Sequence, residues 1–196
     1  MTQLFDHKLN TIKWIGIVTM TIDHIGAFIF PGFLFLRIIG RIAFPCFLYS
    51  TIEGTERTKD YKKYAIRLFL LGILSMPVTP HSFNVLFLLL LFSLSIKYKR
   101  YTLIFALISL FVEYSIYGFL FGWALYWLKN RQVYQGVLFS LVVQLLVGLS
   151  VQLYSLLALP LFIKPLDVKL PILPKYSLYF SYPLHQLLLI LIASFL

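Results

Sequence analysis

Long apolar runs alternate with short polar gaps along the whole chain. The runs predict helices at about 11–30, 33–54, 61–79, 83–97, 101–116, 117–129, 133–149, 150–164 and 177–196. Only 12% of the residues are charged, whereas a soluble domain carries about 25%. The pattern predicts an all-α integral membrane protein, a polytopic bundle of about nine (seven to nine) transmembrane or half-membrane helices. With no linker or low-complexity tract, residues 1–196 form one predicted domain.

Two runs, 101–129 and 133–163, are too long for one span and too short for two. Each would extend about 43 Å as a helix, against a hydrocarbon core of about 30 Å. Single helices give seven spans and place Lys129 and Arg131 outside the cell. Pairs of short helices give nine spans without that violation, so we favour the paired arrangement. Broken helices at membrane depth are tolerated where they line a cavity enclosed by protein.

Lys and Arg occupy every second gap, which predicts the topology. Basic clusters precede the first predicted helix and follow the second, fourth, sixth and eighth. By the positive-inside rule, the N-terminus is cytoplasmic and the C-terminus outside, in the cytoplasmic (inner) membrane. The first apolar run lacks a small-residue cleavage site, so no cleavable signal is expected. The net charge of +10 is spread over these clusters, which argues against nucleic acid as a partner and for the lipid bilayer.

The segment Ile22-Asp23-His24-Ile25-Gly26 places a carboxylate and an imidazole inside an apolar helix. An Asp at a helix centre costs roughly 2.5 to 3.5 kcal/mol on insertion scales. Such residues in a membrane helix face the protein interior and mark functional sites. We therefore expect a polar cavity between helices at this depth.

Other ionisable residues lie at about the same depth. Asp23 and His24 are about 18 Å from the cytoplasmic end of their helix, and Arg41 is at a similar level. Glu113 falls about 12 residues into the fifth predicted helix, and His185 lies near the middle of the last. Five ionisable side chains from four helices should therefore face one another, because unpaired charges in hydrocarbon are costly.

Helical geometry suggests how these groups pair. Adjacent residues diverge by about 100°, so Asp23 does not orient His24 directly and is the natural partner of Arg41. Asp23 shares its helix face with small or polar residues suited to close packing: Gly16, Thr19 and Gly26. On the last helix a polar seam should face inward, with a kink at Pro183. It consists of Ser177, Ser181, His185 and Gln186.

A second polar cluster lies nearer the cytoplasm and contains Glu53, Glu56, Arg57, Lys62, Lys63 and Arg67. It is either a positive-inside loop or an entry site for a polyanionic ligand. Arg67 favours the second, because it is too deep for a loop and a guanidinium suits phosphate. The four His residues lack metal-ligand spacing, and the single Cys46 is expected to pack in an apolar run. No metal is predicted.

At these residues the chain resembles the TraX family of small membrane proteins, within the wider group of transmembrane acyltransferases. The matching motifs are Ile22–Gly26, Gly40-Arg41-Ile42-Ala43-Phe44-Pro45, Glu53-Gly54, Tyr64, Arg67-Leu68, Asn84–Phe87, Glu113–Gly118 and Tyr179–His185. They occur in family order from about residue 12 to the C-terminus. The chain departs from the family where Glu113-Tyr114-Ser115 replaces the usual Asp-Tyr-Gly.

The resemblance implies an acetyltransferase that uses acetyl-CoA as co-substrate, since the founding member acetylates the N-terminus of a conjugative pilin. We expect His24 to be the general base, with His185 as the second choice. Arg41 would stabilise the oxyanion or hold the carboxylate of Asp23, and Glu113 would complete the catalytic set. The donor would bind at a set of cytoplasmic residues: Arg67, Lys62, Lys63 and Glu53. The acceptor would be a protein N-terminus or an envelope glycan.

Two other classes of protein stay open at this point. A proton- or anion-coupled transporter also needs carboxylates, His and Arg at the midplane, together with broken helices. Against it, the order of motifs shows no internal repeat. A non-catalytic membrane scaffold has no use for five buried ionisable groups.

Overall fold

The computed structural model describes the chain except residues 1–5, 79–82, 149, 165–167, 175–176 and 196, and the side chains of 178 and 179. In this described part every regular element is helical, apart from a single bridge between Phe83 and Val112. The α-helices are α1 (His7–Phe28), α2 (Leu34–Gly40), α3 (Ala43–Arg57), α4 (Tyr61–Ser75), α5 (Val85–Lys97), α6 (Thr102–Ser109), α7 (Ser115–Lys129), α8 (Val133–Leu145), α9 (Leu159–Ile163) and α10 (Ser177–Ala193). Three short 3₁₀ segments are η1 (Met76–Val78), η2 (Lys99–Tyr101) and η3 (Val151–Ala158).

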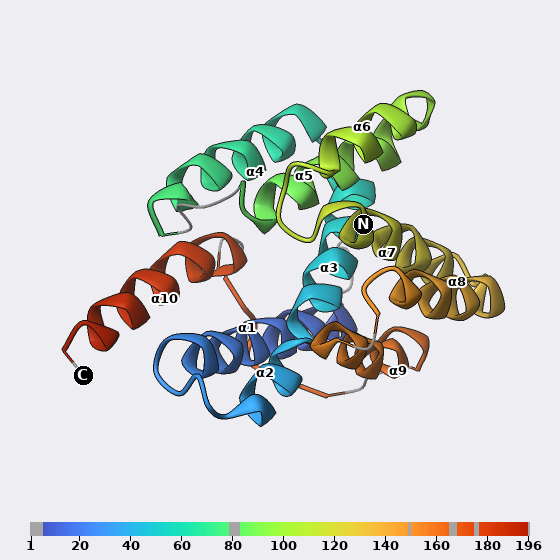
Figure 1. The fold of residues 1–196 in the computed structure, drawn as a ribbon. Coiled ribbons are helices and arrows are strands. Elements are labelled where there is room, and N and C mark those ends of the chain that lie inside the picture. Colours follow the sequence, from blue (N-terminus) through green and yellow to red (C-terminus); the bar gives the residue numbers. More distant parts are fainter. Residues whose placement is uncertain (1–5, 79–82, 149, 165–167, 175–176, 196) are drawn as a thin grey trace.

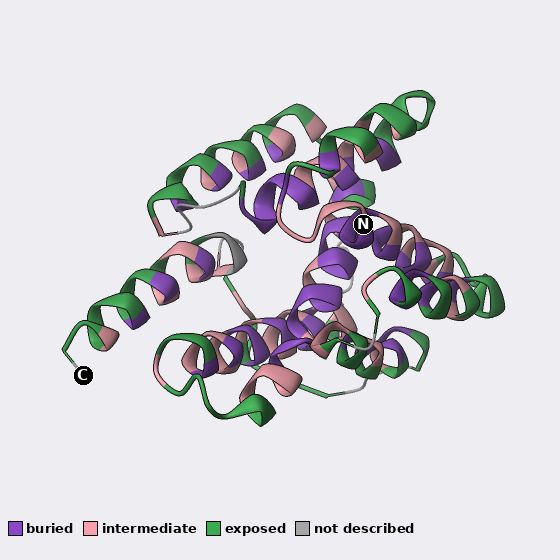
Figure 2. Ribbon diagram, viewed as in Figure 1, coloured by how far each residue is buried: buried purple, intermediate pink, exposed green. Residues whose placement is uncertain are grey.

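Helix α3 is the centre of the fold and packs against α1, α5, α7 and η3 (Figure 1). Its side chains Leu48 and Ile52 are fully buried and lie one turn apart on the same face. Figure 2 shows buried residues concentrated along α3 and the inner faces of α5 and α7, with exposed residues on the outer faces of α4, α6 and α8. The predicted all-α class is therefore confirmed.

The remaining helices pack around α3 in antiparallel pairs. Helices α4 and α5 form one pair and α7 and α8 form another, while the last helix, α10, packs against both α1 and α4 (Figure 1). The chain thus returns at its C-terminal end to the face of α1 that carries His24. This long-range contact brings two distant sequence motifs together.

Several helix boundaries differ from the prediction. The two long runs do break into pairs, α6 with α7 and α8 with η3 and α9, as the paired arrangement predicted. The predicted helix 33–54 corresponds to one helical stretch, Leu34–Arg57, which the turn residues Arg41 and Ile42 divide into α2 and α3. The prediction that Glu113 lies within a helix is wrong. Glu113 lies in the connection between α6 and α7. Helix α6 already ends at Ser109, and Tyr114 and Ser115, with left-handed φ values of 65° and 47°, lie at the start of α7.

Polar side chains cap the N-termini of three helices by accepting hydrogen bonds from otherwise unpaired backbone N–H groups. Asp6 accepts from the amide of Leu9 at 2.9 Å at the start of α1. Asp60 does the same for Lys63 at the start of α4. Asn84 caps α5, and its amide also donates to the carbonyl of Gly72 at 2.7 Å, which ties α5 to α4.

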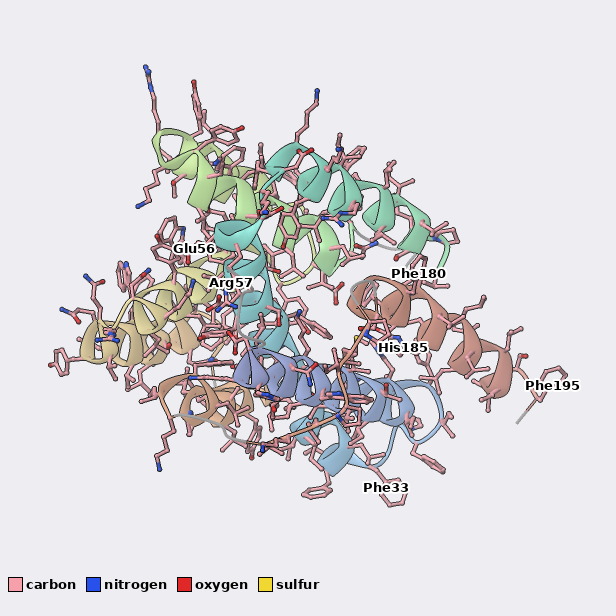
Figure 3. The ribbon with its side chains drawn as sticks, turned by 180° about the vertical axis from the view of Figure 1, so that it is seen from behind. Phe33, Glu56, Arg57, Phe180, His185 and Phe195 are labelled. Carbon is pink, nitrogen blue, oxygen red and sulfur yellow. The ribbon has the colours of Figure 1, made fainter. Side chains whose placement is uncertain are left out.

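Ion pairs hold the basic ends of α1, α3 and α7 together. Arg57 at the end of α3 pairs with Asp6 at 2.7 Å and with Glu53, one turn earlier. Lys129 at the end of α7 pairs with Glu53 and Glu56. Figure 3 shows Glu56 and Arg57 at this end of α3. These pairs connect three elements that lie far apart in the sequence.

The outer surface is strongly apolar. Phe33, Phe180 and Phe195 are 65%, 59% and 88% exposed and project outward (Figure 3). Among the described helices, one stretch, Leu34–Arg57, is long and apolar enough to cross a bilayer, and four shorter helical stretches are also apolar. A surface so rich in exposed apolar side chains indicates a membrane-associated protein.

Candidate active site

His24 of α1 and His185 of α10 are in direct contact. Nδ1 of His24 lies 2.5 Å from Nε2 of His185, and the ring centroids are 4.7 Å apart. Both side chains are partly buried, and His185 lies between α10 and α1 (Figure 3). The two imidazoles, separated by 160 intervening positions in the chain, therefore form one hydrogen-bonded pair.

The hydrogen bonds of the pair define its proton positions. Nδ1 of His185 is within hydrogen-bond distance of the Ser181 carbonyl, which can only accept, so this nitrogen carries a proton. In the neutral pair, Nε2 of His185 then has an electron pair and accepts from Nδ1–H of His24. The remaining electron pair of the unit is therefore on Nε2 of His24.

The surroundings of His24 agree with this assignment. The side-chain amide nitrogen of Gln186 lies 3.4 Å from Nε2 of His24, where an N–H can point only at an electron pair. Gln186 is 3% exposed and follows His185 directly on α10. It belongs to the polar seam that the sequence predicted for this helix.

Asp23 binds two guanidinium groups. Its carboxylate accepts from Arg41, the predicted partner, and from Nη1 of Arg37 at 2.8 Å. Nη1 of Arg37 also donates to the backbone carbonyl of Asp23 at 2.9 Å. Asp23 and Arg41 are each 8% exposed. One carboxylate and two guanidiniums leave one net positive charge beside His24.

Small residues allow the helices to approach closely enough for this pairing. A Cβ built on Gly40 would lie 2.2 Å from Cβ of Asp23, and one on Gly26 would lie 2.7 Å from Cβ of Leu36. The predicted small-residue face of α1 therefore packs against α2 at Gly26 and against α3 at Gly16. A larger side chain at Gly40 would displace the Asp23 carboxylate from its two partners.

Glu113 reaches the site from the connection between α6 and α7. Its backbone N–H donates to the carbonyl of Phe83 at 2.7 Å, and its Oε2 accepts from the amide of Val85 at 2.9 Å. The ring of Tyr114 stacks on Phe44, with centroids 4.0 Å apart. These contacts fix the left-handed turn and direct the carboxylate to the level of Asp23.

His24 lines two adjoining cavities, and a third cavity adjoins one of them. The polar cavity, of about 250 Å³, is lined by Asp23, His24, Ala27, Arg37, Arg41, Glu113, Tyr114 and Gln152. A connecting cavity of about 40 Å³ shares His24 and Glu113 with it and is also lined by Phe47, Val85 and Tyr182. These last three residues line a third, mostly apolar cavity of about 120 Å³, enclosed by α1, α3, α4, α5 and α10. His24 thus faces a series of adjoining cavities through the bundle.

The residues predicted to bind the donor are divided between two helices, α4 and α3. Lys62 and Lys63 are exposed on the first turn of α4, where Lys63 pairs with Asp60. Arg67 is half-buried one turn further along α4. Glu53 is engaged by Arg57 and Lys129 in the ion pairs described above. Their role as donor contacts stays a prediction.

The structure brings together all five predicted catalytic side chains. Asp23, His24, Arg41 and Glu113 line one cavity, and His185 contacts His24. Sequence reasoning missed Arg37, although its i, i+4 spacing from Arg41 places both guanidiniums on one helix face. It also missed Gln152, which lines the polar cavity from η3 and carried no motif.

The fold and the site define an all-helical, membrane-associated protein with a buried polar centre that joins helices from both ends of the chain. The family model for "TraX protein" matches residues 8–193, so the chain belongs to the TraX family. The family predicted from the sequence motifs is therefore confirmed. The match includes every residue of the site.

Two curated proteins are similar to this chain. A probable fimbrial assembly protein FimC, serogroup H1, of Dichelobacter nodosus is 26% identical over 96% of this chain and 97% of its own length. The uncharacterized protein RP591 of Rickettsia prowazekii (strain Madrid E) is 45% identical over 20% of this chain and 16% of its own length. No solved structure matches the chain.

Proposed function

We propose that this chain is a multi-pass membrane acetyltransferase that moves an acetyl group from acetyl-CoA to an acceptor amine or hydroxyl. One observation carries the proposal. His24 lines two adjoining cavities and carries the remaining electron pair of the histidine pair on its Nε2, while His185 holds the opposite nitrogen of the ring. A neutral imidazole placed in this way suits general-base catalysis near pH 7.

In the proposed reaction the acceptor nitrogen or oxygen attacks the thioester carbonyl carbon. As the new bond forms, Nε2 of His24 takes the acceptor's proton, and the carbonyl electrons move onto oxygen. The tetrahedral intermediate then collapses, the C–S bond breaks, and the thiolate of CoA leaves. His24 returns the proton to that thiolate, so the protein ends the cycle unchanged.

His185 would support the base as a positioning residue. When Nε2 of His24 gains a proton, the proton on its Nδ1 can move to Nε2 of His185. The positive charge is then shared between two rings and also faces the carbonyl of Ser181. Sharing lowers the cost of forming an imidazolium away from water.

The Asp23–Arg37–Arg41 cluster would stabilise the developing oxyanion. Asp23 accepts from both arginines, which fixes the guanidiniums in place before the reaction. Preorganised donors and charges of this kind are worth several kcal/mol when water is excluded. This arrangement assigns Asp23 to holding the arginines rather than to orienting His24.

The donor would approach from the cytoplasmic end of the bundle. Lys62, Lys63 and Arg67 on α4 would contact the phosphates of acetyl-CoA, as cations contact phosphate elsewhere. Glu53 would act indirectly, because its carboxylate holds Arg57 and Lys129 at that end. This arrangement keeps the nucleotide in water and only the acyl-bearing arm inside the protein.

The membrane topology and the acceptor complete the proposal. The N-terminus would be cytoplasmic, the apolar outer faces of the short helices α6 and α8 would face lipid, and η3 would reach the site through Gln152. The Dichelobacter nodosus relative is described as a fimbrial assembly protein. This favours a pilin or another envelope protein N-terminus as acceptor, ahead of an envelope glycan.

The test uses the purified full chain in liposomes with acetyl-CoA labelled in the acetyl group. An acceptor peptide with a free pilin-like N-terminus should gain the label, and the same peptide with a blocked N-terminus should not. Proton or anion flux across the liposome, with no acetyl-CoA consumed, would instead identify a transporter. No turnover and no flux would contradict both functions.

A further inference from the structure

The mostly apolar cavity that joins the site through Phe47, Val85 and Tyr182 has no role in the chemistry described so far. We call it the Ser50 cavity. Its α3 wall consists of residues on one helix face: Phe47, Ser50, Thr51 and Gly54. The opposite wall comes from Tyr64 and Leu68 of α4 and from α5, and Lys13 of α1 lies at its edge.

The Ser50 hydroxyl is the unusual feature of this cavity. Ser50 is 9% exposed, and its Oγ has no hydrogen-bond partner among the described residues. A buried hydroxyl without a partner costs about 1–3 kcal/mol, and a Ser in a helix normally avoids this cost by bonding to the carbonyl four residues earlier. Ser75 and Ser140 of this chain do bond in that way. The Ser50 hydroxyl is therefore available to form a hydrogen bond with a ligand that enters the cavity.

The two ends of the Ser50 cavity differ in their surroundings. Lys13 precedes His24 by 11 positions on α1, which separates them by about 16 Å along the helix axis. Lys62 and Lys63 immediately precede Tyr64, a lining residue, on α4. Cations therefore lie near one end of the Ser50 cavity, and the catalytic imidazole lies beyond the other.

We propose that the Ser50 cavity is the binding site for the linear, amide-bearing arm of a thioester donor, with the donor's anionic head at Lys13. This inference rests on the proposed function. An arm with amide groups supplies the hydrogen-bond partner that Ser50 lacks, and its methylene groups match the apolar walls. A lipid tail would satisfy the walls but leave Ser50 unpaired. The thioester at the end of the arm would reach the connecting cavity beside His24.

The test compares two donors, acetyl-CoA and acetyl-pantetheine, with purified variants in liposomes. Acetyl-pantetheine has the same arm and thioester but no nucleotide phosphates. The Ser50→Ala variant should raise KM for both donors by about five- to tenfold, the effect of one lost hydrogen bond, and should leave KM for the acceptor unchanged. Lys13→Gln should raise KM for acetyl-CoA only.

A stability measurement separates this role from a structural one. Ser50→Ala removes a hydroxyl that has no partner, so its apparent unfolding temperature should equal or exceed that of the wild type. The matched control is Ser140→Ala on α8, whose hydroxyl donates to the carbonyl of Gly136 at 2.8 Å. It should lower the unfolding temperature and leave both KM values unchanged.

The bulkier variant Ser50→Ile fills the cavity and should abolish use of both donors. If the wild type transfers acetyl groups and both Ser50 variants keep wild-type KM values for the two donors, the cavity assignment is wrong while the proposed function stands. If the wild type transfers no acetyl group from either donor, the proposed function itself has failed.

Discussion

His185 accepts a hydrogen bond from His24 across 2.5 Å, and this contact determines which nitrogen of the pair is free to react. The direction follows from Ser181, whose carbonyl can only accept from the other nitrogen of His185. The acidic and basic groups nearby are engaged with one another: Asp23 with Arg37 and Arg41, and Glu113 with the amide of Val85. The remaining electron pair of the unit is therefore on Nε2 of His24, with the amide nitrogen of Gln186 3.4 Å away.

Gly40 is expected to be intolerant of any side chain. Gly40→Ala should destabilise the protein by about 1–3 kcal/mol, the cost of overpacking, because the new Cβ would lie 2.2 Å from that of Asp23. In a chain of this size the loss corresponds to about 2–10 °C in apparent unfolding temperature. The control is Gly32→Ala, since no atom of the described structure lies within 4 Å of a Cβ there. Equal unfolding temperatures for the two variants would contradict the close packing of α1 against α2.

The charge of Glu113 is predicted to matter more than its hydrogen bond. In Glu113→Gln the amide oxygen can still accept from Val85, so stability should change little. Losing the negative charge should raise KM for an amine acceptor by about 10- to 150-fold, because a charge-assisted contact is worth about 1.5–3 kcal/mol. KM for a hydroxyl acceptor should stay the same. Glu56→Gln, a change in the ion-pair cluster outside the cavity, is the control, and an equal effect of both variants on amine binding would refute a local role for Glu113.

Acid should weaken the attachment of α1 to α3. Burial acts to raise the pKa of Asp6, but the Leu9 amide and the Arg57 guanidinium outweigh it, so the pKa lies below its ordinary value. A lowered pKa in the folded state adds stability above the unfolded-state pKa of about 3.9, and this stability is lost as pH falls through the folded value. The wild type should therefore have a higher unfolding temperature than Asp6→Asn at pH 7, and the difference should vanish as the pH falls below the folded-state pKa of Asp6. A constant difference over that range would exclude this ionisation as the cause.

The membrane topology can be tested with the single cysteine. Cys46 is buried against Gly16, so it should resist a membrane-impermeant thiol reagent in intact cells. After Cys46→Ser, single cysteines at Thr58 and Asn130 should be labelled only in inside-out vesicles, and one at Gly32 only from outside. Labelling of all three positions from one side would overturn the multi-pass arrangement.

The sequence predicted the site better than it predicted the helix boundaries. The pairing of Asp23 with Arg41 followed from the cost of charges in hydrocarbon, which requires buried ionisable groups to face each other. The same argument brought His24 and His185 to one level, although no short-range pattern links residues so far apart in the chain. The cost of burying unpaired ionisable groups, rather than a sequence motif, was therefore the basis for predicting that these residues meet.

The remaining features depend on packing that hydropathy does not encode. The turn at Arg41–Ile42 carries neither Gly nor Pro at its two positions, and its Arg41 pairs with Asp23. The left-handed residues Tyr114 and Ser115 at the start of α7 are not glycines, so nothing in their identity marks this turn. The Ser50 cavity involves five helices, and only the assembled bundle shows that the hydroxyl is left without a partner.

The central claim is that Nε2 of His24 is the base and His185 is its positioning partner. The most direct measurement is kcat/KM for acetyl transfer, with its solvent deuterium isotope effect, in three variants. His24→Gln should lower kcat/KM by about 10²–10⁴-fold, which is the usual contribution of a general base. His185→Gln, whose amide oxygen can still accept from His24, should lose only about tenfold and show a smaller isotope effect, while His185→Leu should lose more. If His24→Gln instead transfers acetyl groups at the wild-type rate, or His185→Gln is the more damaging of the two changes, the assignment of the base is contradicted.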